Sequence, residues 1–453
     1  MQSIVEKQKQ FYFTGQTRDY AFRMKQLNKL KTMLETYEEE IYDALKMDLN
    51  KSKHESLTTE LGILYTEINF TMKHLKKWME TEDVPTPLTH KGTSNYIMYE
   101  PYGVTLIISP WNYPVQLALA PVIGAIAAGN TVVLKPSELT PHTSGLINKM
   151  VTETFPATFF TVVEGDKDAS QALLAQRFDY IFFTGSTNVG KIVMKEAAKN
   201  ITPLTLELGG KSPTIVDRDC HVNFAAKRIA WGKFTNAGQT CVAPDYVYVH
   251  EKVKKKFLKA LKKQIVDLYG KNTLQNDDYV RIVNSNHFNR LFPYLSEGTL
   301  YHGGDYDRTR CKMEPTVITD ITWDDEVMQE EIFGPILPIL TYKDLDDIIP
   351  IIQREEKPLA LYYFGRNKKN EQKVLQNISF GGGCVNDTLY HLANPHLPFG
   401  GVGQSGLGAY HGKTSFKTFS HAKSMLKQTN AFDIPVRYPG GKLATKLAEK
   451  LFK

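Results

Sequence analysis

Residues 104–134 have the sequence VTLIISPWNYPVQLALAPVIGAIAAGNTVVL, in which no side chain is charged. The stretch exceeds the roughly 20 residues that a membrane-spanning helix needs, but three prolines interrupt it. Its β-branched start at 104–108 predicts a strand, the Ala- and Leu-rich part at 115–128 predicts a helix, and 131–134 predicts a second strand. We therefore expect a buried strand–helix–strand unit rather than a membrane span.

The same alternation of short apolar runs and helical stretches continues beyond this unit. Further strands are expected at 161–163, 180–183 and 204–208, and helices near 142–154, 168–176 and 187–199. Parallel strands connected by helices predict an α/β fold with a doubly wound parallel sheet, whose ligands bind beyond the carboxyl ends of the strands. Residues that directly follow these strands are therefore the first candidates for function.

Two further regions flank this predicted sheet in the sequence. Before it, Leu27, Leu30 and Leu34 recur at helical spacing, and the helical run continues through Ile41 and Leu45. After it, residues 209–400 form a second α/β segment that we expect to be a separate domain. In that segment, strands are expected at 246–250, 336–340 and 359–364, with a basic helix near 252–268.

The composition is that of a soluble globular protein. The 453 residues include 55 Lys and Arg against 49 Asp and Glu, without the basic, aromatic-rich clusters that nucleic-acid binding needs. The four cysteines include no CxxC pair, so we expect neither a disulfide framework nor a metal site. The first ten residues mix both charges without an apolar segment, from which we expect a cytoplasmic protein.

Two glycine-rich motifs suggest nucleotide binding. Residues 185–191, GSTNVGK, nearly match the phosphate-binding P-loop, but Ile192 replaces the hydroxyl residue that binds Mg²⁺. GVGQSG at 401–406 matches the dinucleotide fingerprint, yet no strand is expected before it and the acidic ribose partner is missing. The first motif still suits a pyrophosphate at a helix N-terminus. A P-loop-like nucleotide-binding protein without redox chemistry is therefore one alternative.

Three residues have side chains suited to carbonyl chemistry. Cys241 follows a Gly- and Thr-rich approach that predicts a loop, where a nucleophile or a small buried apolar side chain would both fit. Glu207 closes an expected strand, where it could act as a base or form one half of an ion pair. Asn112 follows the first strand, where it could simply form a turn. None of the three decides the function alone.

Taken together, the motifs resemble one family, the NAD(P)-dependent aldehyde dehydrogenases, across nearly the whole chain. In the family's order, the matching stretches are PWNYP at 110–114, LKPSE at 134–138, FTGSTNVG at 183–190, LELGGKSP at 206–213, GQTC at 238–241, EEIFGPI at 330–336 and PFGGVGQSG at 398–406. The short region ahead of PWNYP and the DIPVRYP stretch at 433–439 resemble the class 3 branch, which acts on fatty, aromatic and medium-chain aldehydes.

The resemblance implies a catalytic role for each of the three residues. Cys241 would be the nucleophile that adds to the aldehyde carbon, giving a thiohemiacetal and then a thioester. The side-chain amide of Asn112 and the backbone N–H of Cys241 would stabilise the oxyanion, and Glu207 would deprotonate the water that hydrolyses the thioester. Transfer of the acyl group to coenzyme A is the alternative within the family, and a base at Glu207 argues against it.

The resemblance also implies a cofactor site. Its residues are Lys135, Glu138, Gly185, Ser186, Gly190, Leu208, Glu331 and Phe333. Lys135 and Glu138 would hold the adenosine ribose, Ser186 would meet the pyrophosphate, Glu331 would hold the nicotinamide ribose, and Phe333 would lie behind the ring. Because a carboxylate accepts from a free 2′-hydroxyl but repels a 2′-phosphate, we expect NAD as the cofactor, with NADP use left open.

The substrate is expected to be an apolar aliphatic or aromatic aldehyde. Tyr65, Tyr113, Trp231, Thr240 and Phe399 match or neighbour substrate positions of the class 3 branch and would give a largely aromatic, uncharged wall. For Tyr65 and Trp231 a place in the hydrophobic core is an equal alternative. No Arg or Lys stands at these positions to bind a substrate carboxylate.

The resemblance finally divides the chain and implies a homodimer. A cofactor-binding domain is expected at 1–85 and 101–208, a catalytic domain at 209–405, a small β oligomerisation arm at 86–100 and 406–430, and a tail at 431–453. In the tail, Leu443, Leu447 and Leu451 share one face of an expected helix, with lysines between them. We expect a docked or frayed terminal helix there rather than peripheral contact with a membrane.

Overall fold

The first sheet is the doubly wound parallel sheet that the sequence predicts. The computed structural model describes residues 1–434, 437–439 and 441–452. Six strands lie in the order β17-β7-β6-β3-β4-β5, and all neighbours are parallel except β17 and β7. They are β3 (Val104–Ile108), β4 (Thr131–Lys135), β5 (Phe160–Val162), β6 (Tyr180–Thr184), β7 (Leu204–Glu207) and β17 (Gly406–Leu407). The five predicted strands are confirmed to within a residue at each end.

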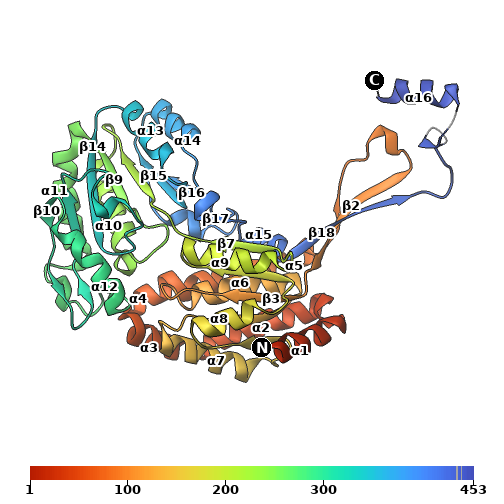
Figure 1. The fold of residues 1–453 in the computed structure, drawn as a ribbon, viewed down its shortest axis with the longest axis horizontal. Helices are drawn as coiled ribbons and strands as arrows, with labels where there is room; N and C mark the ends of the chain where they lie inside the picture. The colour runs from red at the N-terminus through yellow and green to blue at the C-terminus, as the bar shows by residue number, and fades with distance from the viewer. Residues whose placement is uncertain (435–436, 440, 453) are drawn as a thin grey trace.

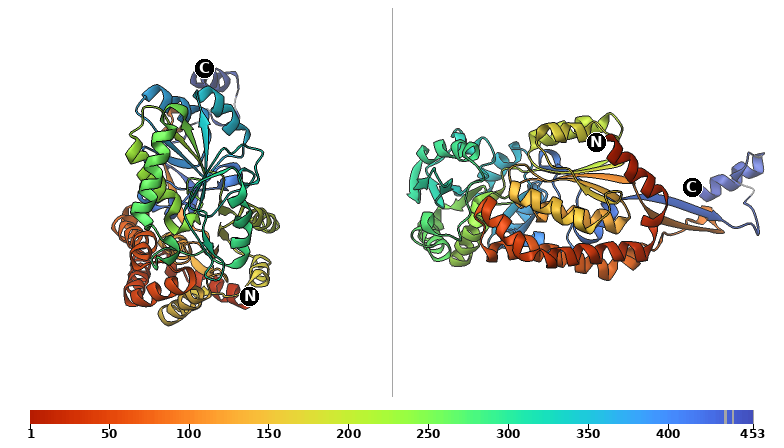
Figure 2. Two further views of the ribbon diagram at one scale, coloured as in Figure 1. Left: turned by 90° about the vertical axis from the view of Figure 1, so that its left-hand side faces the viewer. Right: turned by 90° about the horizontal axis from the view of Figure 1, so that it is seen from below.

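Helices cover both faces of this sheet (Figure 2). The helix α6 (Gln116–Ala128) is buried along its whole length, because its Ala, Leu and Ile residues leave no polar face. No helix of the described residues is long and apolar enough to span a membrane. The other connecting helices are α7 (Pro141–Thr154), α8 (Lys167–Leu174) and α9 (Thr187–Ala198).

The N-terminal region is helical, but the predicted continuous run is broken. It contains α1 (Gln2–Phe13), α2 (Tyr20–Thr36), α3 (Glu38–Leu49), α4 (Lys53–Ser56) and α5 (Gly62–Trp78). The leucines that predict the run are fully buried, yet a break at Tyr37 separates α2 from α3. A π-helical turn, Leu57–Leu61, joins α4 to α5.

The rest of the molecule, apart from the β arm and the tail, is built around a second sheet of seven strands (Figure 1). The two sheets and their helices are called the body. In order across the sheet, its strands are β10 (Thr299–His302), β13 (Thr316–Thr319), β14 (Ile336–Tyr342), β9 (Tyr246–His250), β8 (Pro213–Val216), β15 (Ala360–Phe364) and β16 (Gly382–Val385). Its helices are α10 (Val222–Phe234), α11 (Glu251–Tyr269), α12 (Ser285–Leu291), α13 (Leu345–Arg354) and α14 (Lys368–Asn377). Only β10 is antiparallel to its neighbour.

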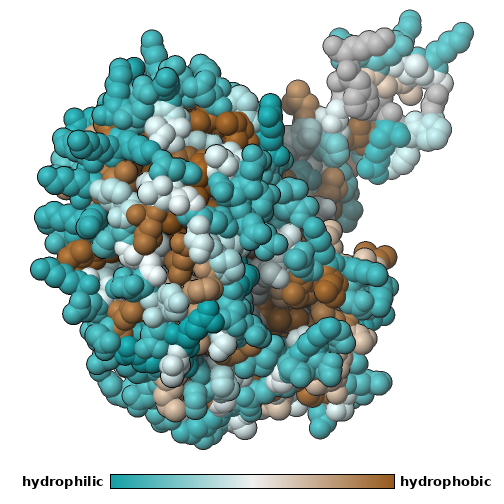
Figure 3. All heavy atoms as spheres, turned by 60° about the vertical axis from the view of Figure 1, so that its left-hand side comes forward, coloured by the Kyte–Doolittle hydropathy of each residue, from teal (hydrophilic) through white to brown (hydrophobic). Residues whose placement is uncertain are grey.

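A β arm projects from this body (Figures 1 and 3). It is a three-stranded sheet of β1 (Glu82–Asp83), β2 (Thr93–Pro101) and β18 (Ser420–Gln428). The residues from 406 to the start of β18 do not belong to the arm. In this segment β17 lies in the first sheet, and α15 (Gly412–Thr418) packs on α5 and α6. We therefore propose that the arm begins at Ser420 rather than at residue 406.

The tail ends in a helix, as the sequence predicts. This helix, α16 (Lys442–Phe452), lies beyond the tip of the arm in Figure 1. Of the three leucines that define its predicted apolar face, the side chains of Leu443 and Leu451 lie outside the described residues. The predicted amphipathic face is therefore left as a prediction.

Candidate active site

The candidate site lies at the carboxyl edge of the first sheet. The chain reverses its order across the sheet at β3, which pairs with β4 on one side and β6 on the other. Parallel α/β sheets bind ligands at such a switch point. Four of the predicted site residues end or follow these strands: Asn112 after β3, Lys135 in β4, Ser186 after β6 and Glu207 in β7.

A strained loop next to the second sheet presents Cys241. After α10, Asn236 and Ala237 both adopt left-handed backbone angles, with φ of 54° and 51°, which non-glycine residues rarely do. Glu55 helps to hold this loop, since its Oε1 accepts from the backbone N–H of Asn236 at 2.8 Å. Gly238 is required because a Cβ there would lie 2.2 Å from the carbonyl oxygen of Gly334.

Asn112 and Tyr113 lie directly against the Cys241 loop. The side-chain amide of Asn112 donates to the carbonyl of Gln239 at 3.0 Å, which fixes its orientation and leaves its second N–H unused by that bond. The Tyr113 hydroxyl and Thr240 Oγ1 are 2.6 Å apart. Residues that follow the first sheet therefore meet the loop of the predicted nucleophile, although they are 127 positions apart in the sequence.

The Cys241 thiol has two carboxyl groups within electrostatic reach. Burial raises the pKa of the thiol, and the charges of Glu331 and Glu207 raise it further. The backbone N–H groups of Cys241 and Val242 act in the opposite direction, because they donate toward the sulfur. The side chain is nevertheless only partly buried, so a small molecule has access to it.

Glu207 is a buried carboxyl group without a hydrogen-bond partner. It is 2% exposed, and neither carboxylate oxygen has a partner among the described residues. Burial raises its pKa well above the ordinary value of a glutamate. Because an unpaired buried carboxyl group costs stability, its presence is typical of a functional site rather than of a structural ion pair.

Glu331 and Phe333 come from a loop that a buried ion pair holds in place. Lys211 Nζ lies 2.6 Å from Asp245 Oδ2, and Asp245 Oδ1 accepts from the N–H of Ile332 at 3.0 Å. Burial, followed by the charge of Asp245, raises the pKa of Glu331 to about 8. The Glu331 carboxylate fills the space beside Gly209, where a Cβ would lie 2.1 Å from its Oε2.

The ring of Phe333 faces Trp111 at the same site. Their centroids are 5.4 Å apart and the planes meet at 80°. Phe333 has a left-handed φ of 49°, a conformation that bulky residues rarely adopt and that clusters at functional positions. The predicted position behind a nicotinamide ring therefore has an unusual backbone that fixes the direction of the aromatic side chain.

The remaining predicted cofactor residues lie at or just after the ends of β4, β6 and β7 and in the first turn of α9. Lys135 Nζ and Glu138 Oε2 are 2.6 Å apart, with Lys135 almost fully buried and Glu138 partly exposed. Ser186 caps α9, whose N-terminus and dipole suit a phosphate. At Gly190 a Cβ would lie 2.6 Å from Leu208, so the glycine lets α9 approach β7 closely. Gly185 likewise packs against the ring of Phe183. These residues fit an extended dinucleotide with two riboses and a pyrophosphate.

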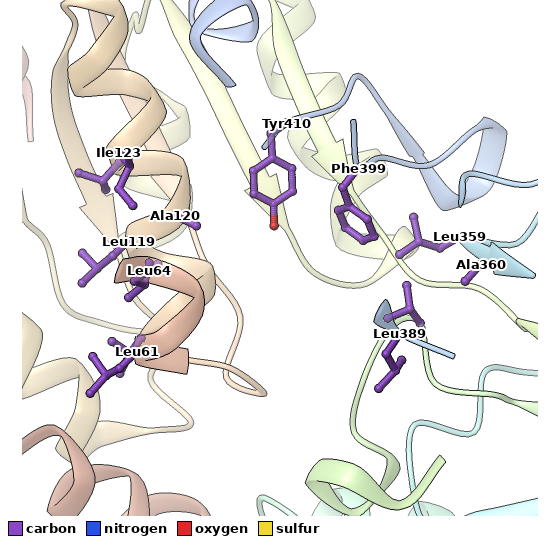
Figure 4. Close-up of a cluster of buried hydrophobic side chains, with 14 of the residues drawn as sticks. Leu61, Leu64, Leu119, Ala120, Ile123, Leu359, Ala360, Leu389, Phe399 and Tyr410 are labelled. Carbon is purple, nitrogen blue, oxygen red and sulfur yellow. The ribbon is translucent and has the colours of Figure 1, made fainter. Parts of the chain in front are cut away.

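A cavity of about 180 Å³ opens beside α5 and α6. It is lined by Thr58, Gly62, Ile63, Thr66, Glu67, Ala120, Leu392, Ala393, Pro395 and His411. Apolar side chains dominate the neighbouring cluster in Figure 4, where Leu64 and Ala120 lie opposite Phe399 and Leu389. In that view the hydroxyl of Tyr410 points into the space between the two groups.

Tyr65 does not line this cavity, and its predicted place in the substrate wall stays a prediction. Tyr65 lies on a different face of α5, and its hydroxyl donates to Glu38 Oε2 at 2.8 Å. Ile63 occupies the cavity wall instead. Helical rotation of about 100° per residue explains the difference, because two positions along a helix change the face entirely. The structure shows the Tyr65 hydroxyl on Glu38, and both the substrate wall and the core stay predictions for this residue.

The other predicted substrate residues lie at varying distances from this cavity. Phe399 is buried and stacks on His411, with ring centroids 5.4 Å apart. Trp231 packs near Tyr390, at 6.1 Å between ring centroids, and does not line the cavity. Tyr113 and Thr240 lie instead at the nucleophile loop.

Three residues near the site escape the sequence analysis. Burial raises the pKa of Tyr410 well above its usual value, and the charges of Glu207, Cys241 and Glu67 raise it further. Burial also raises the pKa of Glu67 to about 7 and lowers that of His411 to about 4. Neither a strand end nor a turn signal marks these residues in the sequence.

A cysteine, a buried carboxyl group and an oriented amide thus meet at the end of a dinucleotide-type sheet, as in enzymes that attack a carbonyl carbon and pass a hydride to a nicotinamide. The model of the aldehyde dehydrogenase family matches residues 4–425 of the chain. The chain belongs to this family and is an aldehyde dehydrogenase.

Individual relatives agree with this assignment. The chain is 50% identical over 447 residues to the 4,4'-diaponeurosporen-aldehyde dehydrogenase of Staphylococcus aureus, covering 98% of this chain and 97% of that one. It is 44% identical over 439 residues to the mouse "aldehyde dehydrogenase, dimeric NADP-preferring", covering 96% and 97%. The solved structure "Substrate bound state of Staphylococcus Aureus AldH" matches with a TM-score of 0.97 and 49% identity, over 100% and 99% of the two chains.

The comparisons also bear on the branch and on the alternatives. Several further relatives are named as members of aldehyde dehydrogenase family 3, which confirms the class 3 resemblance. Neither coenzyme A acylation nor nucleotide binding without redox chemistry receives support from them.

Proposed function

We propose that this enzyme oxidises apolar aldehydes to carboxylic acids through a covalent thioester on Cys241. The observation that carries the proposal is the unpartnered, fully buried carboxyl group of Glu207 beside a partly exposed cysteine. A general base needs a raised pKa and a free oxygen, and Glu207 has both.

The proposed reaction begins at the sulfur atom. The Cys241 thiolate adds to the carbonyl carbon, an S–C bond forms, and the negative charge moves to the substrate oxygen. The Asn112 amide and the N–H of Cys241 would stabilise that charge, and one such donor typically contributes about 2.7–4 kcal/mol. Loss of a hydride from the adduct carbon, which a bound nicotinamide would accept, leaves the thioester. Glu207 then takes a proton from the water that attacks the thioester carbon, and the S–C bond breaks to release the carboxylic acid and restore the Cys241 thiolate.

The nicotinamide cofactor supplies the hydride acceptor when it is bound. Glu331 would hold its nearer ribose, Phe333 would set the plane of the ring, and the N-terminus of α9 at Ser186 would bind the pyrophosphate. Glu138 would accept from the adenosine ribose, while Lys135 compensates its charge. We propose NAD as the preferred cofactor, with NADP also used, since the mouse relative is named NADP-preferring. Comparing kcat/KM for both cofactors tests this, and a strong preference for NADP would contradict it.

The proposed substrate class follows from the cavity wall. Leu392, Ala393, Ile63 and Ala120 are uncharged, and the Staphylococcus aureus relative is named for a long apolar aldehyde. Burial favours the neutral form of Glu67, so this residue repels an anionic substrate only weakly. The cavity disfavours anionic substrates mainly because no described residue of its wall offers a cation to bind them. We expect kcat/KM to rise with chain length from propanal to octanal and to be lowest for semialdehydes with a carboxylate.

The direct test uses hexanal and benzaldehyde with NAD and records absorbance of the reduced cofactor. Wild-type protein should turn over both aldehydes, and Cys241→Ser should lose turnover while it still binds NAD. Cys384→Ser is a suitable control, because Cys384 is also a partly buried free thiol but hydrogen-bonds to His391 at 3.5 Å. Turnover that survives in Cys241→Ser, or is absent in the wild type over a broad aldehyde panel, would contradict the proposal.

We further propose that the enzyme is a cytoplasmic homodimer joined through the β arm. Support comes from exposed apolar side chains on the arm strands, Met98 at 37%, Met425 at 38% and Leu426 at 50% exposure, and from the mouse relative's printed description as dimeric. Fractionation of cells that express the tagged protein tests the location, and recovery with the membrane pellet would contradict it and favour contact through the tail.

A further inference from the structure

Lys51 and Glu60 form an ion pair in the protein interior. Lys51 Nζ lies 2.7 Å from Glu60 Oε1, and both side chains have no solvent exposure. Removing two charges from water often costs more than their attraction returns, so stability alone gives no reason for such a pair. Both residues instead contact the segment that carries the proposed oxyanion donor, Asn112.

Glu60 holds the start of the helix that follows Asn112. Its second oxygen, Oε2, accepts from the backbone N–H groups of Val115 at 3.0 Å and Gln116 at 2.9 Å. These N–H groups begin α6, where the helix leaves its first donors unpaired and where its dipole favours a negative charge. The carboxylate thereby fixes the chain just beyond Asn112 and Tyr113.

Lys51 holds the other side of the same segment. Its Nζ donates to the carbonyl oxygen of Asn112 at 3.4 Å and lies 4.3 Å from the centre of the Tyr113 ring. Asn236, in the nucleophile loop, donates its side-chain N–H to the same carbonyl oxygen at 2.8 Å. The backbone of Asn112 is therefore held between the ion pair and the Cys241 loop.

The turn that carries Glu60 has an unusual geometry. Glu60 lies in the π-helical turn Leu57–Leu61, and such turns are rare and frequent at functional sites. Gly62 closes the turn, because a Cβ there would lie 2.7 Å from the carbonyl oxygen of Leu57. A π-helical turn inserts one residue into a helix, and here the inserted turn carries the carboxylate that reaches α6.

We propose that the Lys51–Glu60 pair positions Asn112 for oxyanion stabilisation. Neither residue reaches the reacting atoms, so both act through the backbone at Asn112. The inference rests on the proposed function and adds two positioning residues to it. A displacement of about 1 Å in a catalytic group can cost about a hundredfold in rate. Loss of the pair should therefore lower kcat strongly, whereas the affinity for the cofactor should change far less.

The test replaces both charges at once with K51M/E60Q. This variant removes both charges of the pair together, while Glu55, which also interacts with Lys51, keeps its hydrogen bond from the N–H of Asn236. The amide that replaces the Glu60 carboxylate keeps an oxygen that can accept from both helix N–H groups. We expect kcat for hexanal to fall by about tenfold to a hundredfold, while the Kd for NAD stays within about twofold. The exposed pair Lys53–Glu39, 2.6 Å apart and 64% and 76% exposed, supplies the matched control K53M/E39Q, whose kcat should be unchanged.

A double-mutant cycle with Asn112→Ala separates positioning from general destabilisation. If the pair acts through the Asn112 amide, K51M/E60Q should change the residual kcat of Asn112→Ala by less than about twofold. A full loss that persists in the Asn112→Ala background, or an unchanged kcat in folded K51M/E60Q, would overturn the inference. Thermal unfolding checks that the variants fold. If K51M/E60Q does not fold, the same cycle is measured with E60Q alone. A wild-type enzyme without aldehyde turnover would instead overturn the proposed function.

Discussion

Glu207 and Glu331 are the two residues whose chemistry depends most on their surroundings. Both carboxyl groups have a raised pKa, but Glu207 is buried without a hydrogen-bond partner among the described residues, whereas Glu331 is partly buried and accepts from the backbone N–H of Gly210. The sequence motifs, through the family resemblance, single out Glu207, Cys241 and Asn112, and for Glu207 and Asn112 the motif also coincides with the end of a strand. The sequence could not predict the contact of Tyr65 with Glu38, because the face on which Tyr65 lies depends on where the preceding π-helical turn places α5.

The charge of Glu331 should make the nucleophile less acidic. Because that carboxylate raises the pKa of the Cys241 thiol, Glu331→Gln should lower this pKa and increase the thiolate fraction near pH 8. We expect alkylation by iodoacetamide to become severalfold faster at that pH in the apo enzyme. Measured over a range of pH, the rate profile should shift to lower pH, and a shift to higher pH would contradict the assigned charges.

At the scale of elements, the contact between α9 and β7 shapes the cofactor path. The strands of the first sheet could be predicted from sequence because apolar runs and breakers mark them. The close approach of α9 to Leu208 could not, because it depends on tertiary packing at Gly190. The break between α2 and α3 was equally hidden, since Tyr37 continues the apolar pattern.

Gly190→Ala should therefore weaken cofactor binding. Its Cβ would lie 2.6 Å from Leu208, and such overpacking typically costs about 1–3 kcal/mol. We expect the Kd for NAD to rise by about tenfold, as measured by quenching of protein fluorescence. Gly145→Ala is the control, because the nearest atom to its Cβ is 3.9 Å away. Equal effects of the two substitutions would argue against a specific role for the contact.

At the scale of the whole molecule, the arm is the part with least contact to the body. β2 and β18 pair along their full length, yet their apolar side chains Met98, Met425 and Leu426 stay exposed. Exposed apolar residues gathered on one element are typical of an interface. The sequence predicts an arm by resemblance, but its start at Ser420 requires knowledge of the pairing between β17 and β7.

Charges on the arm should disrupt the proposed dimer. We expect the double variant M425E/L426E to scatter as a monomer, whereas the wild type scatters with twice the monomer mass. Leu300→Glu serves as control, because Leu300 is also 50% exposed but lies on β10 of the body. A wild-type monomer, or an M425E/L426E variant that remains dimeric, would contradict the proposed interface.

The central claim is that Cys241 carries the acyl group and that Glu207 activates the water that removes it. The most direct measurement is intact-protein mass spectrometry of Glu207→Gln after mixing with NAD and hexanal. We expect one hexanoyl group per subunit, located on the peptide that contains Cys241, together with a burst of one reduced cofactor per subunit and slow turnover. An unmodified protein despite the burst, or an acyl group on another residue, would contradict the account.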